Sequence, residues 1–241
     1  MKKGTTLAAI DVGTTKVCTT IAEVENGKIL RVIGVGITPS SGMHKGLVVG
    51  IDDAKQSIRE SVRKAEYASG RKVESAYIGV TGRHVSSFNR RGAVAIARHD
   101  RMVRFDDLKR VLRSARSFHI PNGQRLLHII PRSYAVDGSA GVRDPVGMHG
   151  AKLDVETHII TAAAASMKNI ASCIQGLGIG IEELVLEPLA SSEAVLTEEE
   201  RQKGVILADI GGGTTDVAIF RDGSIWHTAI ISVAGYQLTR D

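Results

Sequence analysis

Two stretches of the sequence combine a carboxylate, glycines and threonines in an order that suits a phosphate ligand. In the second stretch, an apolar run is followed by Asp209, Gly211, Gly212, Gly213, Thr214 and Thr215. Because glycine has no Cβ, backbone N–H groups in such a turn can approach an anion closely, and successive N–H groups form an anion-binding concavity. The threonine hydroxyls add donors, and Asp209 suits a magnesium ion held through water. Taken alone, the stretch also fits an ordinary glycine-rich hairpin.

The same pattern occurs near the N-terminus, in residues 7–36. An apolar run there is followed by Asp11, Gly13, Thr14 and Thr15. A second strand, an Asn26-Gly27 hairpin signal and a third strand come next, just as Asp222-Gly223 and a third strand follow the later copy. Internal repetition of this kind bears on the whole fold. Two phosphate-sized turns in one chain predict two lobes that grip one polyphosphate.

Two further residues are candidates for phosphate chemistry. Lys16 follows the first turn, where its ammonium would reach a β- or γ-phosphate; the alternative is an exposed strand lysine. Glu187 precedes Pro188 at a predicted helix start between the lobes, where a carboxylate can orient an attacking water. The alternative role of Glu187 is a favourable interaction with the helix dipole.

Several other kinds of site are excluded by residue spacing. The histidines show no H-x-x-x-H or H-E-x-x-H pattern, so a zinc site of that type is not expected. The sequence has no G-x-S-x-G elbow, and its glycine triplet is not followed by Gly-Lys-Ser as in a P-loop. Gly176, Gly178 and Gly180 follow a predicted helix and precede a strand, the reverse of a dinucleotide fingerprint, so we interpret them as helix-ending glycines.

Composition indicates a globular protein of one or two domains. The chain has 241 residues, of which 43% are hydrophobic and 4% aromatic, so the core is expected to consist mainly of aliphatic side chains. Cys18 and Cys173 lie in apolar-patterned segments, which predicts buried free thiols in a reducing compartment. Asp11 interrupts the first apolar stretch, so we expect no signal peptide, and no apolar run reaches the ~18 residues of a membrane-spanning helix.

The net charge of +5 is unevenly distributed. Residues 83–132 contain twelve Lys or Arg and three Asp, a balance of +9, whereas the rest of the chain is slightly acidic. One interpretation is a solvated surface. The other is a basic module that faces an acidic partner or an anionic membrane. No nucleic acid is expected as a partner, because aromatic residues do not alternate with the arginines.

Periodicity and turn residues place these features in an α/β chain. Helices are expected at 52–70, at 105–115, from Ser166 and from Glu187-Pro188. Asp52 and Ser166 are the expected N-caps, and Gly70 is an expected C-cap. Strands are expected at 73–80, 126–136, 153–162 and 181–186, with two short strands broken by Arg90-Arg91-Gly92 within 85–97. We interpret 137–150 as a loop and 198–200 as part of a linker.

Several segments resemble the actin-like ATPase superfamily and, within it, the bacterial cell division FtsA family. Two of them are the phosphate turns, AIDVGTTK at 9–16 and DIGGGTTDVAIF at 209–220. The others are SSGMHKGLVVGIDDAKQSIRESVRKAE at 40–66, IGVTGRHVSSFNRRG at 78–92, VGMHGAKLDVETHIIT at 146–161, LEPLASSEAVL at 186–196 and AGYQLTRD at 234–241. Their order along almost the whole chain carries the resemblance. The family usually has Gly where this chain has Ala234.

The resemblance implies an α/β fold: an actin-like (ribonuclease H-like) domain, an inserted small α+β strand-helix-strand-strand subdomain, and the start of a second actin-like domain. The implied boundaries are 1–83 and 161–200 for the first domain, 84–160 for the insert and 201–241 for the truncated second domain. It also implies ATP and Mg2+ as cofactors. Asp11 and Asp209 would face the metal through water, both turns would hold the phosphates, and Gly235 would approach the ribose. Glu187 matches the Glu of the Glu-Pro pair that positions water in heat-shock chaperone ATPases.

The resemblance further implies a protein that polymerises and tethers the FtsZ ring to the membrane, with catalysis no faster than a slow ATPase. The implied partners are FtsZ, other division proteins, further copies in a filament and, in the full-length protein, the inner face of the cell membrane. The implied location is cytoplasmic and peripheral at the division septum. One alternative is an ATP-dependent small-molecule kinase of the same superfamily, although no Asp in the sequence stands out as its catalytic residue. The other is a pilus-assembly actin-like protein. Because the sequence stops at Asp241, we expect an N-terminal fragment.

Overall fold

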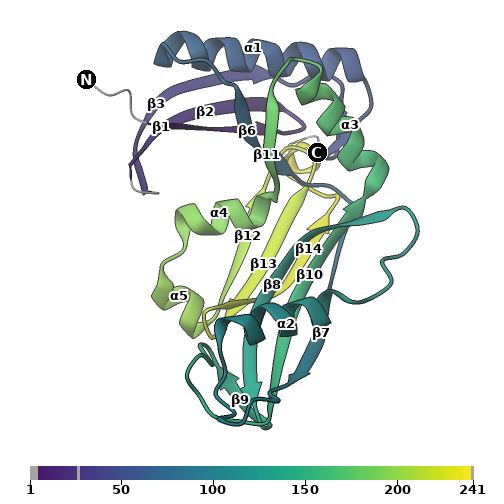
Figure 1. Cartoon of the computed structure of the whole chain (residues 1–241). Coiled ribbons are helices and arrows are strands. Elements are labelled where there is room, and N and C mark those ends of the chain that lie inside the picture. Colours follow the sequence, from purple (N-terminus) through teal and green to yellow (C-terminus); the bar gives the residue numbers. More distant parts are fainter. Residues whose placement is uncertain (1–4, 26–27, 240–241) are drawn as a thin grey trace.

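The computed structural model describes residues 5–25 and 28–239, in which three larger β-sheets and a small hairpin are surrounded by helices (Figure 1). The first sheet lies at the top of the view, the second at the bottom, and the third beside the second and below the first. The small hairpin consists of β4 (Met43–His44) and β5 (Leu47–Val48). This order places the third sheet where it can meet both of the others.

The first sheet carries the N-terminal repeat. Its strand order is β11-β6-β1-β2-β3, with bounds β1 (Thr5–Val12), β2 (Lys16–Glu25), β3 (Lys28–Pro39), β6 (Ser75–Val80) and β11 (Gly180–Leu186). Strands β1 to β3 are antiparallel, whereas β6 runs parallel to β1 and β11 runs parallel to β6. Two helices, α1 (Ile51–Ser69) and α3 (Ala164–Gln175), cover one face and share a core with it that includes Ile10 and Ile58. A Cβ on Gly36 would lie 1.9 Å from the Ser61 carbonyl oxygen, so glycine is required where β3 meets α1.

The second sheet is the insert. Its strand order is β7-β10-β8-β9, with bounds β7 (Val85–Ala95), β8 (Gln124–Val136), β9 (Ser139–Val142) and β10 (Lys152–Ala163), and α2 (Phe105–Arg116) packs over it. The predicted break at Arg90-Arg91-Gly92 is wrong, because β7 is one continuous strand paired with β10 throughout. Gly92 is needed for helix packing: a Cβ there would lie 2.6 Å from the Ala115 nitrogen. The predicted loop at 137–150 also contains β9, which pairs with β8.

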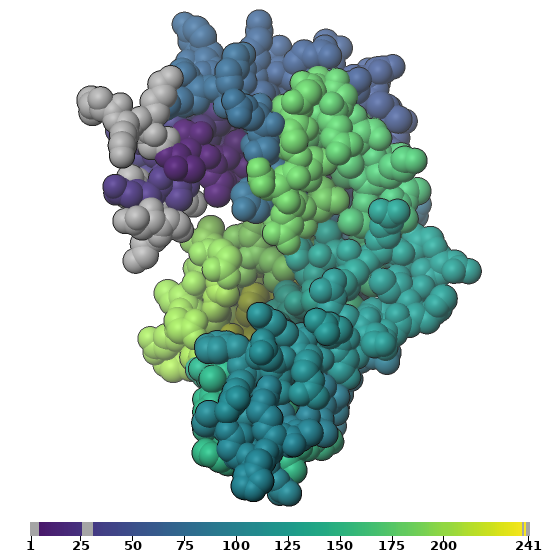
Figure 2. Space-filling model, viewed as in Figure 1, coloured from purple at the N-terminus to yellow at the C-terminus, as the bar shows by residue number. Residues whose placement is uncertain are grey.

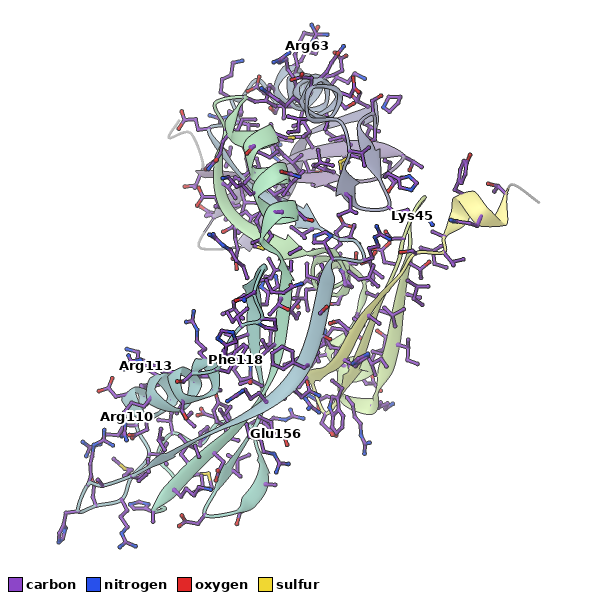
Figure 3. The ribbon with its side chains drawn as sticks, turned by 90° about the vertical axis from the view of Figure 1, so that its right-hand side faces the viewer. Lys45, Arg63, Arg110, Arg113, Phe118 and Glu156 are labelled. Carbon is purple, nitrogen blue, oxygen red and sulfur yellow. The ribbon has the colours of Figure 1, made fainter. Side chains whose placement is uncertain are left out.

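Part of the positive charge of the insert has a structural role. The Asp107 carboxylate is buried, accepts a hydrogen bond from the Arg104 N–H at the start of α2, and pairs with Arg98 and Arg110. Figure 3 shows Arg110 and Arg113 on the side of α2 away from the third sheet. The basic region is therefore partly neutralised from within and partly exposed.

The third sheet carries the second repeat. Its antiparallel order is β12-β13-β14, with bounds β12 (Val205–Ile210), β13 (Thr215–Arg221) and β14 (Ser224–Ile231). The helices α4 (Glu187–Val195), α5 (Glu198–Lys203) and α6 (Gly235–Leu238) belong to this part of the chain. The type I′ hairpin is confirmed, since Asp222 and Gly223 have φ values of 53° and 72°. Asn26-Gly27, the matching signal in the first repeat, lies outside the described residues.

The helix ends test the local predictions. Gly70 is confirmed as a left-handed C-cap with φ 65°. Asp52 and Ser166 are not N-caps, because α1 begins after Gly50 and α3 begins after Ala163. Asp52 instead lies in the first turn of α1, where a carboxylate also favours the helix dipole. Residues 198–203 form α5 rather than a linker, because the hydroxyl of Thr197 caps its first turn.

Candidate functional site

Both glycine-threonine turns line a single cleft. It has a volume of about 540 Å³ and is bounded by strands of the first sheet, by α4 and by the third sheet. In Figure 2 the surface is indented where the first sheet faces α4. The two turns close in the same way: the Gly13 N–H donates to the Lys16 carbonyl at 3.0 Å, and the Gly211 N–H donates to the Thr214 carbonyl at 2.9 Å. The repeat of residue types is therefore also a repeat of backbone geometry.

Most residues singled out from the sequence come together here. The cleft is lined by Asp11, Gly13, Thr14, Thr15, Lys16, Glu187, Asp209, Gly211, Gly212, Gly213 and Thr214. Thr215 and Gly235 are not part of its lining. The Thr215 hydroxyl donates to the Val233 carbonyl at 2.7 Å, and the Gly235 N–H donates to the Gly211 carbonyl at 3.0 Å. Gly235 is thus bonded to the second turn and supports its backbone.

The turns also contact each other, which explains two of the three glycines. A Cβ on Gly212 would lie 2.2 Å from Thr15 Cγ2, and a Cβ on Gly213 would lie 2.7 Å from Thr14 Oγ1. Either substitution would force a threonine of the other turn to move. The glycines are needed for the close approach of the two turns as well as for an open row of N–H groups.

Two aspartates, one from each repeat, face the same space. Burial raises the pKa of Asp11; nearby Lys16 opposes the shift, and the negative charge of Asp209 adds to it. Asp209 Oδ2 accepts a hydrogen bond from the Ser191 hydroxyl of α4 at 2.5 Å. Since two like charges that share one space repel each other, a cation placed between them would be favoured.

Glu187 begins α4, as predicted, with Pro188 in the first turn. Its Oε1 atom is buried and has no hydrogen-bond partner among the described residues. Burial, followed by the charges of Asp11 and Asp216, holds the pKa of Glu187 well above its ordinary value. The backbone of β6 passes close by, since a Cβ on Gly79 would lie 3.2 Å from that Oε1 atom. A buried, unpartnered carboxyl with a raised pKa suits a proton acceptor.

Asp216 is a fourth carboxylate of the cleft, and sequence reasoning missed it. Its side chain is buried, and Oδ1 accepts a hydrogen bond from Thr81, which follows β6. Burial raises the pKa of Asp216 to about 6, although hydrogen bonds from Thr81 and Thr214 act in the opposite direction. The alternation of β13 carried a signal: Asp216 shares the buried face with Ala218 and Phe220, where an apolar residue is expected.

The donor set fits a phosphate ligand and a magnesium ion held through water. Among the described residues, no three His, Cys, Asp or Glu side chains are grouped so that they could hold a metal directly. The four carboxylates nevertheless share one cleft, and Lys16 is its one Lys or Arg among the described lining residues. Magnesium commonly keeps several of its waters and takes few protein carboxylates. Four carboxylates beside two glycine-threonine turns in one cleft are the arrangement that a hydrated cation and a polyphosphate would jointly satisfy.

Comparison with known sequences identifies the family. The sequence model described as "SHS2 domain inserted in FTSA" matches residues 82–161, and the one described as "Cell division protein FtsA" matches residues 206–241. The cell division protein FtsA of Pseudomonas aeruginosa is 42% identical over 241 residues, which is 100% of this chain and 57% of that protein. FtsA of Escherichia coli K12 is 35% identical over 98% of this chain and 56% of its own length. The chain belongs to the FtsA family.

The chain spans 57% of the length of its Pseudomonas relative and 56% of that of its Escherichia coli relative. The fold is actin-like. A chain of the PilM-PilN type IV pilus biogenesis complex is similar in structure, with a TM-score of 0.67 and 15% identity over 97% of this chain and 63% of that chain. The ethanolamine utilization protein EutJ of Carboxydothermus hydrogenoformans has a TM-score of 0.55 and 18% identity, covering 99% of this chain and 56% of its own. Of the described helices, none is both long and apolar enough to cross a membrane.

Proposed function

We propose that the cleft between the first and third sheets binds ATP with Mg2+. The observation that carries the proposal is that two turns of the same geometry, one from each repeat, line one cleft. The backbone N–H groups and hydroxyls of both turns would hold the phosphates, with Lys16 beside the first turn. Asp11 and Asp209 would face a hydrated Mg2+, whose charge would offset theirs. Gly235 would lie near the ribose, and Glu187 would orient water for slow hydrolysis.

Nucleotide titration tests this assignment. In the full-length protein, ATP with Mg2+ should bind saturably, and both Lys16→Ala and Gly212→Asp should weaken that binding. The second change places a side chain where a Cβ already comes within 2.2 Å of Thr15. It also adds a negative charge beside the expected phosphates. Unchanged affinity in both variants would remove the phosphate assignment.

We further propose that the full-length protein polymerises and tethers the FtsZ ring to the inner face of the cell membrane at the septum. Membership of the FtsA family supports this role, and the actin-like fold supports the filament. The insert, which we place at 84–160 between the first-domain segments 1–83 and 161–200, would provide contacts for other copies and for division proteins. The second actin-like domain would begin at 201.

Co-sedimentation tests the tether. The full-length protein should pellet FtsZ together with anionic vesicles, and ATP with Mg2+ should change the amount of polymer. Pelleting that is independent of vesicles would contradict the membrane role. Steady ATP-dependent phosphorylation of a sugar or a small carboxylate would favour a kinase instead.

A further inference from the structure

The carboxyl group of Glu187 has no hydrogen bond at Oε1 that could fix its position. That atom is buried and unpartnered within the described part of the chain. Its place therefore depends on packing beside Gly79 of β6 and on the backbone on which it stands, where β11 ends and α4 begins. Whatever holds this junction also aims the carboxylate at the space between the two turns.

The junction is held from outside the first sheet. Leu186, the last residue of β11 and the N-cap of α4, is 0% exposed. Since β11 is the edge strand next to β6, no strand among the described residues pairs with its outer side. The Leu186 N–H donates to His128 Nε2 at 3.0 Å. A buried backbone donor left without an acceptor is costly, so this bond is a strong constraint on the junction.

His128 belongs to the insert. It lies on β8, and its Cα pairs with Ile160 of β10, the strand between β7 and β8. The side chain is 13% exposed. Because Nε2 accepts a hydrogen bond, the proton of the neutral ring is on Nδ1, 3.9 Å from Glu183 Oε1. Burial lowers the pKa of His128, with Glu183 opposing, which keeps the acceptor available at neutral pH.

The insert is also bonded to the third sheet, so its position reflects both lobes. His158 Nε2 and the Thr228 hydroxyl are 3.0 Å apart, and the Ser224 hydroxyl donates to the Arg132 carbonyl at 2.7 Å. A shift of the insert relative to the first sheet would therefore strain the bond between His128 and Leu186. That strain would act on the backbone of Leu186, the residue directly before Glu187.

We propose that His128 is a positioning residue for Glu187, and that the insert is through it a structural part of the hydrolytic site. The inference rests on the proposed role of Glu187 in ATP hydrolysis. His128 does not touch the reacting atoms; it acts by holding the Leu186 N–H and with it the first residue of α4. A partner or a neighbouring copy that moves the insert would thereby change hydrolysis without reaching the cleft.

The test uses the full-length protein with His128→Leu, which removes the acceptor, and His128→Gln, whose amide oxygen can occupy a similar place to Nε2. His128→Leu should lower kcat about 10-fold or more while the affinity for ATP changes less than about 2-fold, because small displacements of catalytic groups are expensive. His128→Gln should restore most of the rate. His119→Leu, which makes the same change at an exposed histidine of the insert, is the matched control and should leave kcat within about 2-fold.

A double variant shows whether His128→Leu lowers kcat by displacing Glu187 or by disturbing the fold as a whole. Because His128 acts only through Glu187, adding His128→Leu to Glu187→Gln should not lower kcat below that of Glu187→Gln alone. Unaltered kcat in His128→Leu, a loss in His128→Gln or His119→Leu as large as that in His128→Leu, or independent losses in the double variant would each overturn the positioning role. Absence of hydrolysis in the unaltered protein would overturn the role of Glu187 and this inference with it, whereas ATP binding would stand.

Discussion

Replacing Asp216 by asparagine should stabilise the folded protein at neutral pH. The native carboxylate is buried beside Asp11 and Asp209, and its pKa is raised to about 6 from an ordinary 3.8. Asparagine has almost the same shape and can keep the hydrogen bonds to Thr81 and Thr214. It carries no charge, so it avoids the cost of ionising at this position. The stabilising change would thus remove one of the four carboxylates that line the cleft.

The sign and size of the expected change in the free energy of unfolding follow from the difference between the pKa of Asp216 in the folded chain and in the unfolded chain. Below about pH 3, Asp216 is protonated in both the folded and the unfolded chain, so the variant should gain nothing. As the pH rises from about 4 to about 6, only the unfolded chain loses its proton readily, and the native protein loses stability. With about 1.4 kcal/mol for each pH unit between the two pKa values, the gain of Asp216→Asn should approach about 3 kcal/mol above pH 7.

The assay is urea unfolding at several pH values between 4.5 and 7.5, in EDTA and without nucleotide. Asp222→Asn is the control, because that aspartate lies on the exposed turn of the same sheet, with 67% of its side chain accessible. Its unfolding free energy should follow that of the unaltered protein at every pH. If the gain of Asp216→Asn were constant across the pH range, or absent, the buried-carboxylate argument would be wrong.

Three further predictions concern the fold. Gly36→Ala should destabilise the protein by about 1–3 kcal/mol or more in urea unfolding, because its Cβ would lie 1.9 Å from a carbonyl oxygen of α1; an unchanged unfolding free energy would contradict the close packing of β3 on α1. The insert expressed alone as 84–160 should unfold cooperatively by circular dichroism, since it has its own core under α2; a disordered spectrum would count against it. Burial lowers the pKa of His158 to about 4, so acidification from about pH 6.5 towards 4 should lower the free energy of unfolding. In His158→Gln the free energy of unfolding should depend less on pH over this range. The same pH dependence in the variant and the unaltered protein would refute this role of His158.

Local sequence predicted most of the elements because their signals are local. The repeat of strand, turn and hairpin predicted the strands of the first and third sheets around the two turns. Glu187-Pro188 predicted the start of α4, since proline suits the first turn of a helix. The errors arose where a neighbour in space decides. Gly92 looked like a strand break, yet it is the place where α2 lies against an unbroken β7.

The sequence by itself determined the types of chemical group in the cleft: carboxylates at strand ends, glycine turns, and threonine hydroxyls. Only the tertiary structure decided which of them meet. It brought Asp216 to the same space, turned the Thr215 hydroxyl towards the Val233 carbonyl, and set His128 of the insert against the backbone before Glu187. The physical reason is the distance along the chain over which each interaction acts. The conformation of a turn is fixed by its own few residues, whereas burial, repulsion between carboxylates and contacts between sheets depend on segments far apart in the chain.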